Sequence, residues 1–431
     1  PPALSQGPSP RAHGPGGLSD DTSAGRSSGP ATARTLAARP AEFLVCAGPH
    51  ETAREDPMTD LCDSQDARST RTDLPGLALF ARARHVREQL ARLLVARAEL
   101  MHGTSEVLLV RGELAPLLRQ VSEQLTYTQR QDARAAPWDG QRVDYAGAAG
   151  LELWAERLET PWFGVVARSL RFDLQSIAAL DGGLVHGFEA LVRGRLGERE
   201  IGAAALLQAA AAHNQVAIFD ARARKQAILQ AYPQLPAGAR LFVNLSPTAI
   251  YDPDICLGAT FRACVDAGVD IGRLVFEITG THSFPDLTLL RRILERCRDA
   301  GARVALEDMG SGHTSLRSLS TLRPDYLKLD RGLVSGLHHG DPRLPLLAAM
   351  IRHAHDLGVL VVARGVETTD ELQLVRELGV DLGQGYFLGR PSARPSELAT
   401  AARNALGGGI SPRRPEPVRR SFQPQPVPVE F

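Results

Sequence analysis

Polar side chains of a few chemical types follow short apolar runs throughout residues 153–406. Glu189 closes the hairpin that follows the first run, while Asn244 and Glu277 end the next two. The later runs end in, or are followed by, Glu307 with Asp308, Lys328 with Asp330, Glu367, and Gln384. Carboxylates gathered with an amide and a lysine repel one another unless cations are present, and such hard oxygen ligands suit Mg²⁺ or Mn²⁺. Two such ions about 3.5–4 Å apart activate water against a phosphodiester.

The apolar runs alternate with helical patterns, which predicts the elements that carry these side chains. We expect strands at 169–177, 240–245, 273–278, 302–306, 326–329, 359–363 and 382–387. Helical patterns include 202–213, 219–231, 287–300, 344–357 and 371–378. This alternation is typical of a (β/α)8 TIM-type barrel or a doubly wound sheet. No Gly-rich phosphate loop follows the first strand, which counts against a dinucleotide-binding sheet. In a barrel the carboxyl ends of the strands converge at one mouth.

The composition excludes several classes of function. Lys plus Arg and Asp plus Glu are both 49 in the 431 residues, so net charge favours neither nucleic acid nor an acidic membrane surface as the main partner. The most apolar run, 201–212, falls short of the ~20 residues that a membrane span needs. No signal peptide is evident at the N-terminus. The cysteines form no C-x-x-C pair, which argues against zinc and disulfides and predicts a cytoplasmic location.

The chain divides by composition into four parts. Residues 1–75 and 408–431 are rich in Pro with Gly, Ser or Arg, and we expect both tails to be disordered. Residues 76–150 are expected to form a small helical segment, with helices near 77–101 and 113–125, and a linker. Those helices fit either a dimerising or signal-transmitting pair or an amphipathic packing within their own domain. Residues 151–407 are the expected barrel.

Ordered motifs within the barrel region resemble the EAL domain, a bacterial cyclic di-GMP phosphodiesterase family. They are Q-S-I at 175–177, F-E-A-L-V-R at 188–193, V-N-L-S-P at 243–247, F-E-I-T at 276–279, L-E-D-M-G-S-G at 306–312, D-Y-L-K-L-D at 325–330, G-V-E-T at 365–368 and G-Q-G-Y at 383–386. The resemblance covers a little over half of the chain. It implies a barrel that hydrolyses one phosphodiester of cyclic di-GMP to give linear pGpG, and often a homodimer formed through the barrel.

The resemblance also implies a role for each matching residue. The metal-ligand positions are Glu189, Asn244, Glu277, Glu307 and Asp308. The positions that steer water and the metals, or otherwise serve catalysis, are Lys328, Asp330 and Glu367. Arg193 matches a phosphate contact, and the nucleotide site is lined by Gln175, Leu191 and Gln384.

The sequence departs from the family pattern at the site itself. Arg364 stands where the family has its general-base glutamate, and Gly280 replaces a glutamate of the E-I-T-E motif. Glu307 is one methylene longer than the usual aspartate, and His313 replaces an aromatic residue. An arginine cannot act as a base near neutral pH. Its charge ~5 Å from a divalent ion, at an effective dielectric of ~20, costs at most about 7 kcal/mol.

These departures leave three hypotheses. The first is a degenerate EAL domain that binds cyclic di-GMP or a protein partner as a regulator without turnover. The second is a phosphodiesterase that stays active through one or two Mg²⁺ or Mn²⁺ ions. The third is a scaffold that binds neither nucleotide nor metal. A guanidinium at position 364 can also meet a phosphate oxygen bidentately, which leaves nucleotide binding intact.

Overall fold

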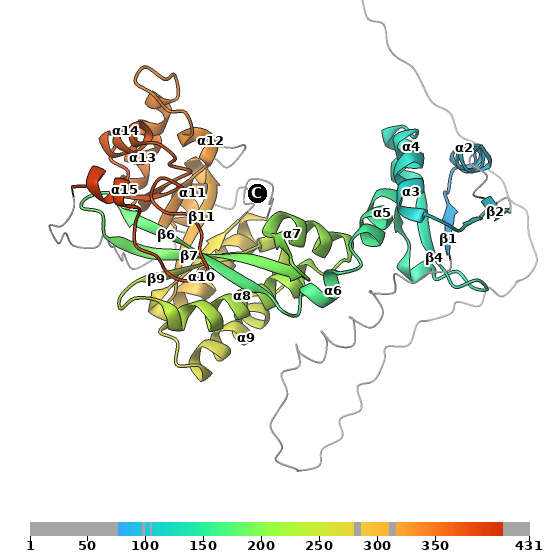
Figure 1. The fold of residues 1–431 in the computed structure, drawn as a ribbon, viewed down its shortest axis with the longest axis horizontal. Coiled ribbons are helices and arrows are strands. Elements are labelled where there is room, and N and C mark those ends of the chain that lie inside the picture. The colour runs from blue at the N-terminus through green and yellow to red at the C-terminus, as the bar shows by residue number, and fades with distance from the viewer. Residues whose placement is uncertain (1–75, 97–99, 104–105, 280–285, 310–315, 408–431) are drawn as a thin grey trace, which may run out of the picture. The chain divides into compact units, whose positions relative to one another are not determined.

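The structure is a computed structural model that describes residues 76–96, 100–103, 106–279, 286–309 and 316–407. The two tails that the sequence predicts to be disordered lie outside these residues. The described residues form a small sheet-and-helix part followed by a barrel (Figure 1). No helix in the described ranges is both long and apolar enough to cross a bilayer.

Residues 76–150 form a five-stranded sheet in the order β2-β3-β1-β4-β5, with antiparallel pairing throughout. The strands are β1 (Gly76–Phe80), β2 (Leu100–Gly103), β3 (Leu108–Val110), β4 (Arg134–Trp138) and β5 (Ala149–Gly150). The helices are α2 (Arg84–Val95), α3 (Leu114–Glu123), α4 (Tyr127–Asp132), the 3₁₀ turn η1 (Tyr145–Gly147) and the following α5 (Leu151–Glu159). Strand and helix order match a ferredoxin-like βαββαβ arrangement.

The prediction of a helical segment with a linker was therefore wrong about the secondary structure of residues 76–150. β1 falls where a helix was expected, β4 and β5 fall where a linker was expected, and β2 begins at the end of the predicted helix. β1 is a run of only five mostly buried residues just before an amphipathic helix, and β4 is mostly alanine and proline. Both segments are strands because β1 pairs with β3 and β4. Local propensity alone does not disclose such pairing.

The barrel is built from eight strands that close on themselves. The order around it is β6-β14-β13-β12-β11-β10-β9-β7, and pairing of β6 with β7 completes the circle. The strands are β6 (Arg171–Ala179), β7 (Val185–Leu196), β9 (Arg240–Leu245), β10 (Leu274–Ile278), β11 (Arg303–Met309), β12 (Tyr326–Leu329), β13 (Leu360–Arg364) and β14 (Leu382–Gln384). All neighbours are parallel except β6, which is antiparallel to both β7 and β14. This confirms the predicted (β/α)8-type barrel.

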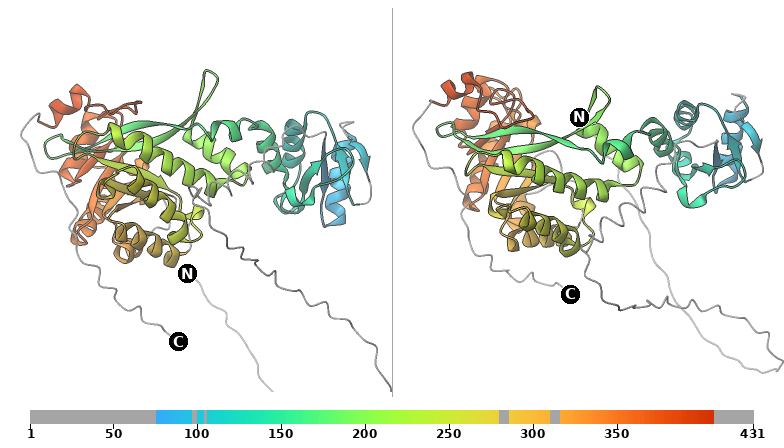
Figure 2. Two further views of the ribbon diagram at one scale, coloured as in Figure 1. Left: turned by 90° about the horizontal axis from the view of Figure 1, so that it is seen from below. Right: turned by 60° about the horizontal axis from the view of Figure 1, so that its bottom comes forward.

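Helices cover the outside of the barrel (Figure 2). They are α6 (Phe163–Val166), α7 (Ala203–Ala212), α8 (Val216–Ala231), α9 (Pro253–Asp266), α10 (Leu287–Asp299), α11 (Leu316–Leu322), α12 (Arg331–Val334), α13 (Leu344–Asp356), α14 (Thr369–Glu377) and α15 (Thr400–Ala405). Smaller elements are the edge strand β8 (Arg199–Gly202) and the 3₁₀ turns η2 (Tyr232–Gln234), η3 (Pro247–Ala249) and η4 (Ile271–Arg273).

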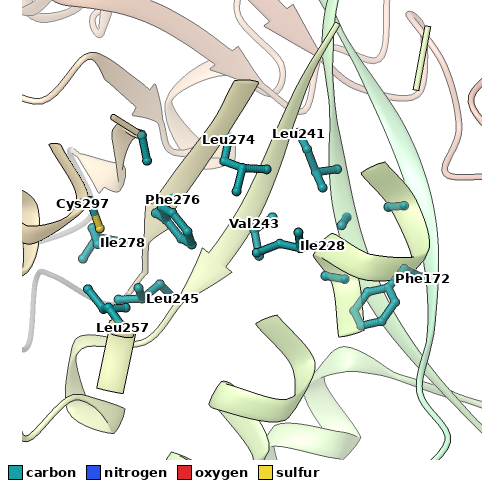
Figure 3. Packing of buried hydrophobic residues seen from close by; sticks show 14 of the residues in the cluster. Phe172, Ile228, Leu241, Val243, Leu245, Leu257, Leu274, Phe276, Ile278 and Cys297 are labelled. Carbon is teal, nitrogen blue, oxygen red and sulfur yellow. The ribbon is translucent and has the colours of Figure 1, made fainter. Parts of the chain in front are cut away.

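Apolar side chains fill the space between strands and helices. Figure 3 shows Val243 of β9 beside Ile228 of α8, and Leu245 of β9 and Ile278 of β10 beside Leu257 of α9. α10 adds a buried stripe of Leu, Ile and Cys at helical spacing. The barrel strands are buried on both faces, so they read as continuous apolar runs rather than as alternating ones.

The barrel interior is closed by a layer of apolar side chains. It consists of Ile177, Ala179, Phe242, Val275, Ala305, Tyr326, Val362 and Leu382. His186 lies in the same region, where its Nε2 and the Tyr326 hydroxyl are 3.1 Å apart. This layer supports the polar residues that come two positions later on the parallel strands.

Candidate functional site

One polar residue from each of the eight barrel strands meets above the apolar layer. We call this set the interior ring: Gln175, Glu189, Asn244, Glu277, Glu307, Lys328, Arg364 and Gln384. On the parallel strands these residues lie two positions after an inward-facing neighbour, as Asn244 follows Phe242 and Lys328 follows Tyr326. Because side chains alternate along a strand, both members of such a pair face the interior.

Lys328 is the centre of the interior ring. Its side chain is fully buried, and Nζ lies 2.9 Å from Oε2 of Glu189 and 2.5 Å from Oε1 of Glu277. A third carboxylate oxygen, Oε1 of Glu307, is 3.6 Å away. A lysine at the end of β12 therefore binds carboxylates from three other strands.

The amides of the ring hold Glu189 from the other side. The Asn244 amide donates to Oε1 of Glu189 at 3.1 Å, and the Gln384 amide donates to Oε2 at 2.8 Å. The Gln384 amide is also 3.2 Å from Oε1 of Gln175, whose own amide donates to the carbonyl of Gly389. Both oxygens of Glu189 thus accept hydrogen bonds from other strands of the barrel.

Arg364 points into the ring. Its Nη1 lies 3.0 Å from Oε1 of Glu307, and its side chain is 30% exposed while that of Glu307 is 6% exposed. Arg364 is the last residue of β13 and pairs in register with Gln384 of β14. The guanidinium therefore occupies the mouth of the barrel beside the carboxylates rather than bulk solvent.

The buried charges shift one another's pKa values. Burial raises the pKa of Glu189, but Lys328, Arg364 and the hydrogen bonds outweigh it and bring that pKa to about 2. Burial and the neighbouring Glu189 carboxylate raise the pKa of Glu277 well above its usual value. Burial lowers the pKa of Lys328, but three glutamates outweigh that effect and raise it above its usual value. Lys328 is thus a fixed cation among these acids.

The donor chemistry of the ring fits one divalent ion. Ligand oxygens of Glu189, Glu277 and Glu307 all lie within 4.8 Å of one another, and these residues are buried. Oε2 of Glu277 is a buried acceptor without a hydrogen-bond partner within the described part of the chain. Carboxylates and an amide oxygen are the ligands that Mg²⁺ and Mn²⁺ prefer. Lys328 and Arg364 compete with an ion for the same oxygens.

The structure places two of the predicted catalytic acids in other contacts. Oε1 of Glu367 lies 2.7 Å from Nη2 of Arg331, the residue that begins α12. Oδ1 of Asp330 accepts the backbone N–H of Gly332 at 2.7 Å and caps α12. None of the contacts that the structure gives for its described residues joins either acid to the ring.

Three further predicted positions are not joined to the ring by the contacts of the described residues. Arg193 pairs with Asp173 and Glu200, and Leu191 lies half-buried opposite Asp173 in the β6–β7 ladder. Asp308 follows Glu307 on β11, but its side chain lies outside the described part, as do Gly280 and His313.

Sequence reasoning missed three partners of the predicted site residues. They are Asp173, which binds Arg193, Arg331, which binds Glu367, and Glu371. Glu371 is buried and accepts backbone N–H groups of Gly336, Glu367 and Thr368 at 2.7–3.0 Å, which fixes the segment after β13. Two signals were available in the sequence: alternation along β6, where Asp173 is two residues from Gln175, and the T-x-x-E capping-box pattern of Thr368 and Glu371.

The family model for the EAL domain matches residues 164–391, a little over half of the chain. The chain belongs to the EAL domain family. This agrees with the closed barrel and with the ring of polar residues at its mouth.

Several relatives carry names that describe an activity, and two of them show the extent of the likeness. The probable cyclic di-GMP phosphodiesterase PdeN of Escherichia coli is 29% identical over 184 residues, 40% of this chain and 33% of its own length. The bifunctional diguanylate cyclase/cyclic di-GMP phosphodiesterase MucR of Pseudomonas aeruginosa is 32% identical over 141 residues, 33% of this chain and 21% of its own. The chain spans about a fifth to a third of the curated relatives that it matches.

A solved structure shares the fold. The FimX EAL domain of Xanthomonas citri, determined in complex with cyclic di-GMP, has a TM-score of 0.50 and is 23% identical in sequence. The match covers 57% of this chain and 96% of that one. The likeness therefore lies in the EAL barrel.

Proposed function

We propose that the barrel is a degenerate EAL domain that binds cyclic di-GMP and hydrolyses it at no more than a trace rate. The observation that carries this proposal is the ion pair of Arg364 with Glu307 at the mouth. The family places its general-base glutamate at position 364, and a guanidinium does not take up a proton at neutral pH. The same guanidinium competes with a metal ion for a carboxylate that the family uses as a ligand.

The charge balance of the interior ring supports binding without a pair of metals. Three glutamates, one lysine and one arginine give a formal charge of 2 − 3 = −1. A glutamate at position 364 would make it 1 − 4 = −3. A ring with a charge of −3 needs divalent cations before an anionic nucleotide can approach. The ring of this protein, with a charge of −1, needs far less added positive charge.

Arg364 also offers hydrogen bonds to the nucleotide. Its side chain is partly exposed at the rim, and a guanidinium can meet a phosphate in a bidentate geometry. Gln384 pairs in register with Arg364 and contacts Gln175, and Oε1 of Gln384 is an acceptor without a hydrogen-bond partner within the residues described. These groups are the proposed contacts for one phosphate and for the nucleotide of cyclic di-GMP.

A second candidate function is an active phosphodiesterase with one Mg²⁺ or Mn²⁺ ion. It is favoured by the three converging glutamates and by the unpaired oxygen of Glu277. Glu189, Asn244, Glu277 and Glu307 would hold that ion. When bound, it would supply a water of lowered pKa. The proton acceptor would then have to be a group other than Arg364.

Turnover assays separate the two functions. Purified protein is incubated with cyclic di-GMP and Mn²⁺, and pGpG is quantified by chromatography. We expect no more than a trace of pGpG from the wild type. Steady accumulation of pGpG would reject the proposal in favour of the active enzyme.

A series of variants tests whether the departures from the family pattern cause the loss of hydrolysis. We expect Arg364→Glu alone to restore less activity than Arg364→Glu combined with Gly280→Glu and Glu307→Asp, because the three positions serve one metal site and should be non-additive. Equal activities of the single and the triple variant would contradict that coupling.

Arg193→Ala should weaken nucleotide binding by about 1.5–3 kcal/mol, the worth of a charge-assisted hydrogen bond.

A further inference from the structure

The strand pair β6–β7 carries a row of charged residues from the interior ring toward solvent. These two strands, nine and twelve residues long, are the longest of the barrel and extend past the others (Figure 2). In their ladder Gln175 lies opposite Glu189, Asp173 opposite Leu191, and Arg171 opposite Arg193. Because side chains alternate, all of these residues share the face that the ring occupies. This face forms one wall of the mouth.

Arg193 is held on this wall by two acids. Its Nε lies 2.8 Å from Oδ2 of Asp173 and 3.6 Å from Oε1 of Glu200 on β8. The closer pair is well shielded, with side chains 18% and 24% exposed, whereas Glu200 is 60% exposed. Nη1 of Arg193 donates to the carbonyl of Val192 at 3.0 Å.

These contacts use both edges of the guanidinium that could bind phosphate. A bidentate contact needs two N–H groups on one edge, either Nε with Nη2 or Nη1 with Nη2. Asp173 accepts from the first edge and the Val192 carbonyl from the second. A phosphate must therefore displace one of them, and a phosphate that approaches Arg193 is also repelled by the Asp173 carboxylate at short range.

We propose that Asp173 is an intramolecular competitor that occupies Arg193 and thereby lowers the affinity of the mouth for anionic nucleotides. The inference rests on the proposed function and adds to it a residue that sets affinity. Asp173 acts through Arg193, and Glu200, which is farther away and mostly exposed, contributes less because solvent screens it.

The experiment is a calorimetric titration of the full chain with cyclic di-GMP. Asp173→Asn keeps the shape and an acceptor for Nε but removes the charge, and we expect about tenfold tighter binding. In an Arg193→Ala background the same substitution should change affinity by about threefold or less, because the competition is gone. Asp181→Asn makes an equal charge change on the loop after β6, at the opposite end of that strand, and should leave the affinity unchanged.

Each result bears on the inference. Weaker binding of cyclic di-GMP by Asp173→Asn would mean that Asp173 positions Arg193 for phosphate, and it would overturn the inference. An unchanged affinity, or an equal gain of affinity in the Arg193→Ala background, would overturn the inference as well. If the wild type binds no nucleotide, the proposed function fails. Binding that then appears in Asp173→Asn would still support the inference, and its absence there would overturn both. Thermal unfolding of Asp173→Asn, Arg193→Ala, the combined variant and Asp181→Asn confirms that the compared proteins are folded.

Discussion

Replacement of Lys328 by methionine tests whether this lysine holds the interior ring together. Methionine is close in length and apolar, so it fills the same volume without charge. The substitution leaves Glu189, Glu277 and Glu307 buried, with ligand oxygens within 4.8 Å of one another. At that separation and an effective dielectric of ~20, each pair of carboxylates repels by about 3.5 kcal/mol.

Three such pairs sum to about 10 kcal/mol, but protonation relieves part of that repulsion. Glu277 is the acid that takes up a proton first, because burial and Glu189 already raise its pKa. We therefore expect a loss of about 3–5 kcal/mol in the free energy of unfolding at neutral pH, the usual cost of removing one partner of a buried ion pair. Urea unfolding followed by circular dichroism measures it.

The chain offers a matched control at Lys225, which is exposed on α8. Lys225→Met should change the free energy of unfolding by less than about 0.5 kcal/mol. The Lys328→Met variant should also gain more stability from added Mn²⁺ than the wild type, because three carboxylates then lack their cation. A Lys328→Met protein as stable as the wild type, or indifferent to Mn²⁺, would refute this reasoning.

Three further predictions concern positions outside the interior ring. A Cβ at Gly385 would lie 2.1 Å from the Val366 carbonyl oxygen, so Gly385→Ala should destabilise the barrel by about 2 kcal/mol or more in urea unfolding. The Cβ of Gly258→Ala, in the middle of α9, meets only a side-chain tip at 3.8 Å, and this variant should be more stable by about 0.5–1 kcal/mol. Equal effects of the two substitutions on the free energy of unfolding would contradict the geometry. Hydrogen bonds from Arg343 lower the pKa of Asp341 to about 2, so this pair stabilises the fold fully above the ordinary pKa of 3.8, and the stabilisation is lost as pH falls toward 2. The difference in free energy of unfolding between wild type and Asp341→Asn should shrink over that pH interval, and a constant difference would count against the prediction. Burial raises the pKa of Cys264 to about 11 and of Cys297 to about 12, so peptide mapping after iodoacetamide treatment at pH 8 should find both thiols labelled only in urea, and labelling of the native protein would be the contrary result.

The barrel could be predicted from the sequence because parallel strands buried on both faces appear as uninterrupted apolar runs. The bounds predicted for two strands, at 240–245 and 326–329, coincide with β9 and β12. The predicted final strand was too long, because β14 ends at Gln384 where Gly385 packs against the backbone of Val366. α9 did not feature among the predicted helices; most of its buried residues lie on one face at helical spacing, but the exposed Ile255 and Val265 outside that face blur the apolar pattern in the sequence.

The site could be predicted as a gathering of residues but not as a set of contacts. The residues after the strands share one mouth because barrel topology requires it, which accounts for Glu189, Glu277 and Lys328. The position of Glu367 after β13 gave no sign that Arg331, from another segment, binds its carboxylate. A long charged side chain can reach several possible ion-pair partners, and the three-dimensional arrangement of the chain determines which of them it contacts.

In the proposed function, Lys328 and Arg364 take over from metal ions in nucleotide binding, and one titration tests this most directly. The affinity of the wild type for cyclic di-GMP is measured by calorimetry in the presence of a chelator and again with excess Mn²⁺. We predict that binding persists in the chelator with an affinity within about threefold of that in Mn²⁺. Binding that appears only when Mn²⁺ is added would contradict the account.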